Sequence, residues 1–137
     1  MGSFSVAVGD LDGDHRPDLV VANIMADSVS VLMNTTEPGA ATPSFAAKVD
    51  LPTGMRPYVV VIGDVNRDGK RDIVVADEAS NAISILLASG TGFTDKIDVA
   101  VLGAPHGVVL ADLDGDDALD VIVSSSDGNM VSVLLAR

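Results

Sequence analysis

Residues 63–72 read Gly63-Asp64-Val65-Asn66-Arg67-Asp68-Gly69-Lys70-Arg71-Asp72, and the same acidic pattern returns at residues 9–18 and 111–120. An apolar run follows the last Asp of each copy. Twelve residues after that Asp, a serine stands inside a second apolar stretch, and these serines are Ser30, Ser84 and Ser132. Three copies that stay in register over this length indicate a structural repeat, in which each copy forms one supersecondary unit.

Each copy is predicted to form short strands joined by polar turns. A strand rich in β-branched residues enters the acidic loop, a second strand leaves it, and a turn with Asn or Asp leads to a third. A fourth strand is expected in two copies only, over residues 45–51 and 93–101, and no helix is expected. The first strands are expected at 4–9, 58–63 and 106–111, and the turns at 23–28, 77–81 and 124–129. Four strands in a unit of this length are typical of the blades of a β-propeller.

The composition narrows the classes of partner. The 137 residues carry a net charge of −12, with 47% hydrophobic and only 3% aromatic residues. This acidity argues against nucleic acid, whose phosphates need Lys and Arg, and against an anionic membrane surface. No apolar run approaches the roughly 20 residues of a membrane helix, so membrane insertion is not expected. Cysteine is absent, which excludes disulfides and thiolate chemistry.

The acidic segments place oxygen-bearing side chains at loop positions one, three, five and nine. Such close like charges repel each other unless a cation neutralises them, and alternate residues of a curled loop can direct oxygens toward one ion. Ligands made of oxygen alone favour Ca²⁺ over zinc or copper, so we predict one calcium ion per loop, about three per chain. The predicted side-chain ligands are Asp10, Asp12, Asp14 and Asp18, then Asp64, Asn66, Asp68 and Asp72, and finally Asp112, Asp114, Asp116 and Asp120. The position-seven residues Arg16, Lys70 and Ala118 are expected to contribute backbone carbonyls.

These loops have two other interpretations, as acidic surface turns and as EF-hands. Acidic surface turns would explain one such loop, but three in register favour a metal site. An EF-hand would place a Glu at position twelve and flank the loop with helices. Position twelve is Val21, Val75 or Val123, each in a strand-like run, which excludes an EF-hand.

These segments resemble the FG-GAP and VCBS-type repeats of integrin α-chain propellers and many bacterial secreted proteins. The resemblance rests on the acidic loop, the Val-Val-Ala run after it, the Ser-Val-Leu-Leu stretch and a Gly-x-Gly-Phe motif. The second copy contains all four, in Gly63–Asp72, Val74–Ala76, Ile83–Leu87 and Gly90–Phe93. The resemblance implies calcium in the hairpin between the first and second strands, and an extracellular or cell-surface location.

The implied fold is an all-β domain over residues 1–137, made of three four-stranded antiparallel propeller blades of which the last is incomplete. The blades are expected at about 4–51, 57–101 and 105–137. Propellers close with about four to eight blades, so three form an open arc that needs further blades or other chains. The expected partners are therefore other copies of the chain or the remaining blades of a larger protein, and a protein or glycan ligand stays open.

One loop position departs from the family pattern. The glycine at position six is kept as Gly69 but is replaced by His15 and Asp117 in the other copies. A left-handed backbone is expected there, which glycine adopts most easily. The second loop is therefore expected to be the best formed.

The leading functional hypothesis is a non-catalytic calcium-binding module for extracellular adhesion, protein interaction or assembly into an oligomer or filament. One alternative is a fragment of a larger secreted enzyme that acts on polysaccharide or lipid. The sequence has no Gly-x-Ser-x-Gly, His-Glu-x-x-His or cysteine nucleophile that would support it. Another alternative is a ring that binds carbohydrate or peptide through Phe4, Tyr58 and His106, which occupy equivalent positions; packing is the favoured role for these three.

Overall fold

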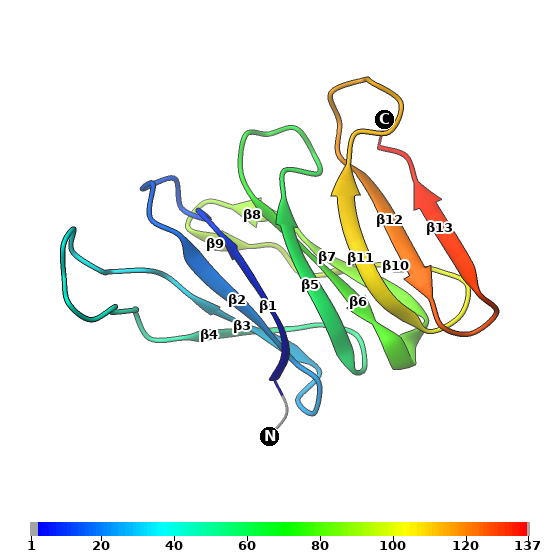
Figure 1. Cartoon of the computed structure of the whole chain (residues 1–137), viewed down its shortest axis with the longest axis horizontal. Helices are drawn as coiled ribbons and strands as arrows, with labels where there is room; N and C mark the ends of the chain where they lie inside the picture. The colour runs from blue at the N-terminus through cyan, green and yellow to red at the C-terminus, as the bar shows by residue number, and fades with distance from the viewer. Residues whose placement is uncertain (1–2, 137) are drawn as a thin grey trace.

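A computed structural model describes residues 3–136, so positions 1, 2 and 137 of the expected domain lie outside it. Three antiparallel sheets follow one another along the chain, together with one small hairpin (Figure 1). The first sheet has the order β1-β2-β3-β4, the second β10-β7-β6-β5 and the third β11-β12-β13, and β8 pairs with β9. These sheets confirm the prediction of an all-β chain with antiparallel pairing.

The strand bounds are as follows. The first sheet contains β1 (Ser3–Gly9), β2 (Asp18–Asn23), β3 (Ser28–Leu32) and β4 (Val49–Pro52). The second contains β5 (Pro57–Gly63), β6 (Asp72–Asp77), β7 (Ala82–Leu86) and β10 (Ile97–Ala100), and the third β11 (Pro105–Ala111), β12 (Asp120–Ser125) and β13 (Met130–Leu134). The hairpin is β8 (Ala88–Ser89) and β9 (Gly92–Phe93), and the only helical element among the described residues is the 3-10 turn η1 (Glu78–Ser80).

The fourth strands are shorter than the sequence suggested. Residues 45–51 were expected to form one strand, but β4 begins only at Val49, and Phe45 makes an isolated bridge with Asn34. Residues 93–101 divide into β9 and β10, because Phe93 pairs with Ala88 in the hairpin whereas Ile97 pairs with Ile85 of β7. The chain changes its partner strand between these residues, which a continuous apolar pattern does not reveal.

The first strands of the three repeats lie side by side. Strand β5 contacts β1 on one side and β11 on the other, and all three run in the same direction in Figure 1. Each acidic loop follows such a strand, so the three loops gather at one end of the molecule. Each first strand also has a register irregularity near its beginning, at Phe4, Tyr58 and His106. A bulge of this kind redirects a side chain, which brings these three residues together as described below.

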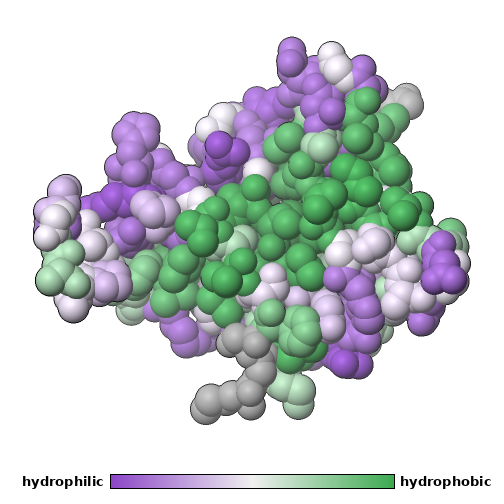
Figure 2. Space-filling model, in the orientation of Figure 1, coloured by the Kyte–Doolittle hydropathy of each residue, from purple (hydrophilic) through white to green (hydrophobic). Residues whose placement is uncertain are grey.

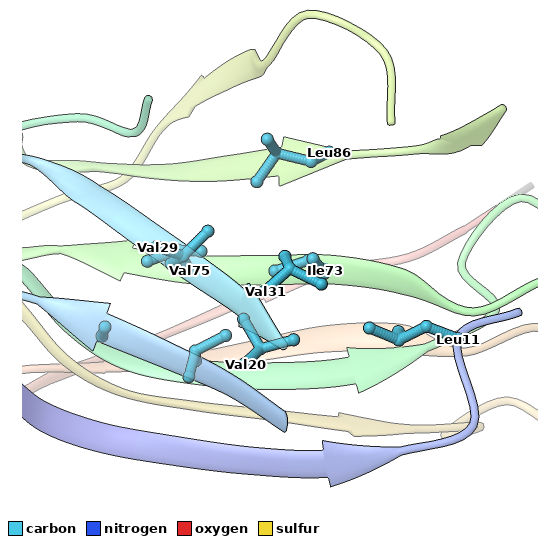
Figure 3. Packing of buried hydrophobic residues seen from close by; sticks show 9 residues of the cluster. Leu11, Val20, Val29, Val31, Ile73, Val75 and Leu86 are labelled. Carbon is cyan, nitrogen blue, oxygen red and sulfur yellow. The ribbon is translucent and has the colours of Figure 1, made fainter. Parts of the chain in front are cut away.

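The core consists of two apolar clusters, one on each face of the second sheet. The first cluster joins the first and second sheets, and Figure 3 shows Val20, Val29 and Val31 facing Ile73, Val75 and Leu86. The second cluster joins the second and third sheets through Val74, Ala76, Ile83, Val108, Val121 and Val123. Because both of its faces are covered, the second sheet buries every residue of β6. Burial of aliphatic surface between sheets therefore stabilises the three repeats as one body.

No helix within the described residues is long and apolar enough to cross a membrane.

Asp77 is a buried carboxyl group that the sequence suggested to be a simple turn residue. It is the last residue of β6 and is fully buried. Its Oδ2 accepts a hydrogen bond of 2.6 Å from the Ser84 hydroxyl, whose Oγ also accepts the Gly54 N–H at 3.0 Å. Burial raises the pKa of Asp77 to about 6, although the bond from Ser84 opposes this shift. The repeated serine of the third strand thus connects a buried acid to the loop before β5.

We expect Asp77 to make the fold less stable as the pH rises from about 4 to about 6, because the folded state holds a proton that the unfolded chain has already lost. A shift of this size corresponds to on the order of 2–3 kcal/mol. Asp77→Asn should remove this part of the pH dependence, since an amide keeps an acceptor for Ser84 without ionising. Denaturant unfolding across this pH range measures the effect, with Asp127→Asn, an exposed turn residue, as the matched control. Identical pH profiles for the wild type and Asp77→Asn would contradict the prediction.

Candidate metal centres

Each acidic loop connects the first strand of a repeat to its second strand. The first loop spans residues 10–18, the second 64–72 and the third 112–120. In every loop, positions four and six adopt a positive φ, which curls the backbone so that alternate residues face one side. The angles are 80° and 67° at Gly13 and His15, 61° and 81° at Arg67 and Gly69, and 80° and 65° at Gly115 and Asp117. The left-handed backbone expected at position six is therefore present in all three loops.

The structure removes the reason for ranking the second loop first. Its glycine lies at position six, but its position four is Arg67, which adopts a positive φ of 61°. The other two loops have the opposite arrangement, with glycine at position four and a polar residue at position six. Each loop thus carries one strained residue that is not glycine. Position six alone does not reveal this, because the compensating glycine of the first and third loops lies at position four.

The first Asp of each loop stabilises the curled backbone by accepting a hydrogen bond from the N–H of position six. One carboxylate oxygen of Asp10 accepts the N–H of His15 at 2.9 Å. Asp64 and Asp112 accept the equivalent N–H groups of Gly69 at 2.8 Å and Asp117 at 3.1 Å. The position-seven residues Arg16, Lys70 and Ala118 donate their N–H groups to the carboxylates of Asp14, Asp68 and Asp116, at 2.8, 2.9 and 2.9 Å.

The last Asp of each loop is fully buried and binds two segments of the chain at once. Asp72 accepts the N–H of Val65 in its own loop at 3.0 Å and the N–H of Ala88, after the third strand, at 2.8 Å. The same pair of bonds occurs in the other repeats: Asp18 accepts from Leu11 and Asn34, and Asp120 accepts from Leu113 and Ala136. Burial raises the pKa of Asp72. This carboxylate therefore has a structural role that the sequence-based assignment as a metal ligand did not include.

Two of the loops bring three carboxylates together. Oxygens of Asp10, Asp12 and Asp18 lie within 4.8 Å of one another, and so do oxygens of Asp112, Asp114 and Asp116. Oxygens that bind one Ca²⁺ at about 2.3–2.6 Å can be at most about twice that distance apart, so both groups fit a single calcium ion. Among the described residues, the second loop forms no such acidic group. Asn66 replaces one carboxylate there, so its donor set has one charge fewer.

Cationic side chains already neutralise part of this charge. Arg16 donates from Nε to Asp14 at 2.7 Å and lowers the pKa of that carboxyl. Arg67 reaches from the second loop to the third, where its Nη2 lies 2.7 Å from Oδ2 of Asp116. The hydrogen bond from the N–H of Ala118 is the largest cause that lowers the pKa of Asp116, and the hydrogen bond from Arg67 lowers it further. The signal for Arg67 was present in the sequence, because it replaces the glycine that the other two loops have at position four.

The three equivalent aromatic residues stack on each other at the opposite end of the first strands. The ring centroids of Phe4 and Tyr58 are 4.1 Å apart, and those of Tyr58 and His106 are 4.5 Å apart with nearly parallel planes. His106 Nε2 also lies 3.2 Å from Oε1 of Glu78, which connects the second and third repeats. Since the ring faces of Tyr58 are covered by its neighbours, this arrangement favours packing over ligand binding.

We expect Asp72→Asn to lower the free energy of unfolding by about 1–3 kcal/mol, because one buried backbone N–H then faces an amide group that cannot accept its hydrogen bond. The measurement is denaturant unfolding in the presence of a chelator, so that no metal contributes. Asp68→Asn in the same loop is the matched control, and this exposed residue should change the value by less than about 0.5 kcal/mol. Equal losses in the two variants would show that the buried position has no special structural role.

Comparison with known families agrees with this geometry. The FG-GAP-like repeat matches residues 10–75 and again residues 64–123, and each match includes two of the acidic loops. Repeats of this kind are typically non-catalytic modules. A search of curated proteins found no match. With three antiparallel units, three curled acidic loops and matches over most of its length, the chain belongs to the FG-GAP-like repeat family.

Proposed function

We propose that this chain is a non-catalytic, calcium-binding β-propeller module that serves protein interaction outside the cell. The observation that carries the proposal is the gathering of three carboxylates in each of two loops with the same curled backbone. A hard divalent cation prefers oxygen ligands of this kind, and the donor set contains no His or Cys that would favour zinc or copper.

The chain's own residues would hold the ion in a consistent way. The first and third residues of each loop would supply carboxylate or amide oxygens, the fifth a carboxylate, and the seventh a backbone carbonyl. In the first loop the buried Asp18 can add an oxygen, because each of its oxygens accepts only one N–H and keeps a second lone pair. The ion would replace repulsion between neighbouring carboxylates with attraction, so its binding energy would stabilise the fold.

The wider arrangement supports a propeller. The three sheets follow one another face to face with their first strands adjacent, which supports blades at about 4–51, 57–101 and 105–137. The family typically occurs outside the cell, which supports the proposed location. The enzyme fragment is not favoured, because the acidic side chains that could act as a catalytic pair are hydrogen-bonded within the loops.

Calcium should raise the melting temperature of chelator-treated protein. At a calcium concentration about a hundred times the dissociation constant, each site adds about 2.7 kcal/mol of stability. We expect Asp12→Ala and Asp114→Ala each to remove one bound ion and part of this increase, because each removes an acidic ligand from a group of three. Differential scanning calorimetry and calcium titration with a fluorescent competitor measure the two effects.

Two controls make this test specific. Asp127→Asn removes the same charge from an exposed turn outside the loops and should leave the number of bound ions unchanged. Magnesium at the same concentration should give a smaller increase, because it retains its water and demands a stricter geometry. If calcium changes neither the melting temperature nor the fluorescence of the competitor, the loops are acidic turns and the proposal is wrong.

A further inference from the structure

The first and third sheets each leave one apolar face uncovered. On the first sheet, Phe4, Val6 and Val8 of β1 are 56%, 59% and 61% exposed, and we call this the first outer face. On the third sheet, Val109, Val131 and Val133 are 57%, 66% and 50% exposed, and we call this the third outer face. In addition, Figure 2 shows hydrophobic residues gathered over the adjacent first strands β1, β5 and β11 of all three sheets, between hydrophilic loops. Exposed apolar side chains that are grouped on one face mark an interaction site.

Each outer face is equivalent to a face that is buried inside the molecule. The residues paired across the first outer face are Val6 with Val21 and Val8 with Leu19. Their equivalents in the second sheet are Val60 with Val75 and Ile62 with Ile73, which pack against the first sheet. On the third outer face, Val109 and Val133 both pair with Ile122. These three residues correspond to Val61, Ile85 and Val74 of the second sheet, which pack against the third. The two outer faces are therefore the two halves of the same packing interface that already joins the sheets.

The residue sizes at this interface fit a second copy of this chain. A Cβ added at Gly9 would lie 3.1 Å from Cγ2 of Ile62, and one added at Gly63 would lie 2.5 Å from Cδ1 of Leu110. Glycine at these positions therefore allows the next sheet to approach. The third repeat has Ala111 at this position, and the residue equivalent to Ile62 and Leu110 in the first repeat is Val8. Valine lacks the δ carbon with which Leu110 would lie 2.5 Å from a Cβ at Gly63, so the smaller Val8 leaves more room for the larger Ala111. A second copy of this chain provides this compensation.

The aromatic stack points to the same occupant. Phe4, Tyr58 and His106 stack in order, and Tyr58 is covered on both of its faces. Phe4 lies at one end of the stack and His106 at the other, each with a neighbouring ring on one side. When the third outer face of one copy packs on the first outer face of another, Phe4 of the second copy continues the stack at His106.

We propose that two copies of this chain associate head to tail, with the third outer face of one copy packed on the first outer face of the other. Such a contact is heterologous, since it joins two different surfaces, and two copies joined at both ends would close a ring of six sheets. The inference extends the proposed function, but it stands on the packing faces and not on the acidic loops. The variants that test it leave those loops intact.

Light scattering coupled to size-exclusion chromatography, in the presence of calcium, tests the contact. We expect the wild type to have the mass of two chains, and Val6→Asp and Val133→Asp each to have the mass of one. An equimolar mixture of the two variants should recover the mass of two chains, because one intact junction remains between them. Met25→Asp, at an exposed methionine in the turn after β2, is the matched control and should stay associated. Thermal unfolding of each variant checks that it is folded.

A second experiment changes the size of the side chains where Val8 of one copy would meet Ala111 of the other. Val8→Leu should weaken association by about tenfold or more, because its δ carbon meets Ala111 as Leu110 Cδ1 would meet a Cβ at Gly63. The double variant Val8→Leu/Ala111→Gly should restore it, since it reproduces the internal contact of Leu110 with Gly63. A wild type with the mass of one chain at all concentrations overturns the proposal. So does loss of association in only one of the two Asp variants, because that result indicates a symmetric contact of one face with itself. Failure of calcium binding would leave these outcomes unchanged, which separates this proposal from the previous one.

Discussion

The packing of one sheet face on the next is the interaction on which the rest of the structure depends. Covering the aliphatic face of a sheet stabilises it, and of the three sheets that residues 3–136 form, only the second has both faces covered. This packing places the first strands side by side, and therefore gathers the three acidic loops at one end and the aromatic stack at the other. The functional features are consequences of how the sheets are arranged.

In the acidic loops, the close approach of the carboxylates conflicts with their electrostatic repulsion. Carboxylates that are close enough to share an ion repel each other, so the backbone must hold them in place. The buried last Asp does so by accepting one N–H from the loop and one from beyond the third strand. The loop is thereby connected to the sheet it serves. Arg16 and Arg67 reduce the remaining repulsion, so hydrogen bonds and ion pairs within the protein support the shape of the loops.

Much of this fold was readable from the repeat. Three copies in register identified the strands, the loops and the position-six backbone, because turn chemistry and apolar runs act locally. The sequence did not show that Asp77 is buried or that residues 93–101 divide between two partners, since both depend on which segment covers them. Nor did it show that Asp72 joins its loop to Ala88, which lies beyond the third strand. A comparison of position four across the loops would have found Arg67.

The fully buried strand β6 has a consequence for how the molecule opens. In a repeat array, stability is close to a sum of unit terms and contacts between neighbours, and the middle unit takes part in both contacts. In a single, unassociated chain either end sheet can separate by breaking one cluster, whereas exposing β6 on both faces requires both clusters to break. Amide protons of Val74 and Val75 should therefore exchange with solvent only through the largest openings, and those of β1 and β13 through smaller, more frequent ones. A single chain would therefore open first at its first and third sheets, and amide protons would exchange most slowly in β6.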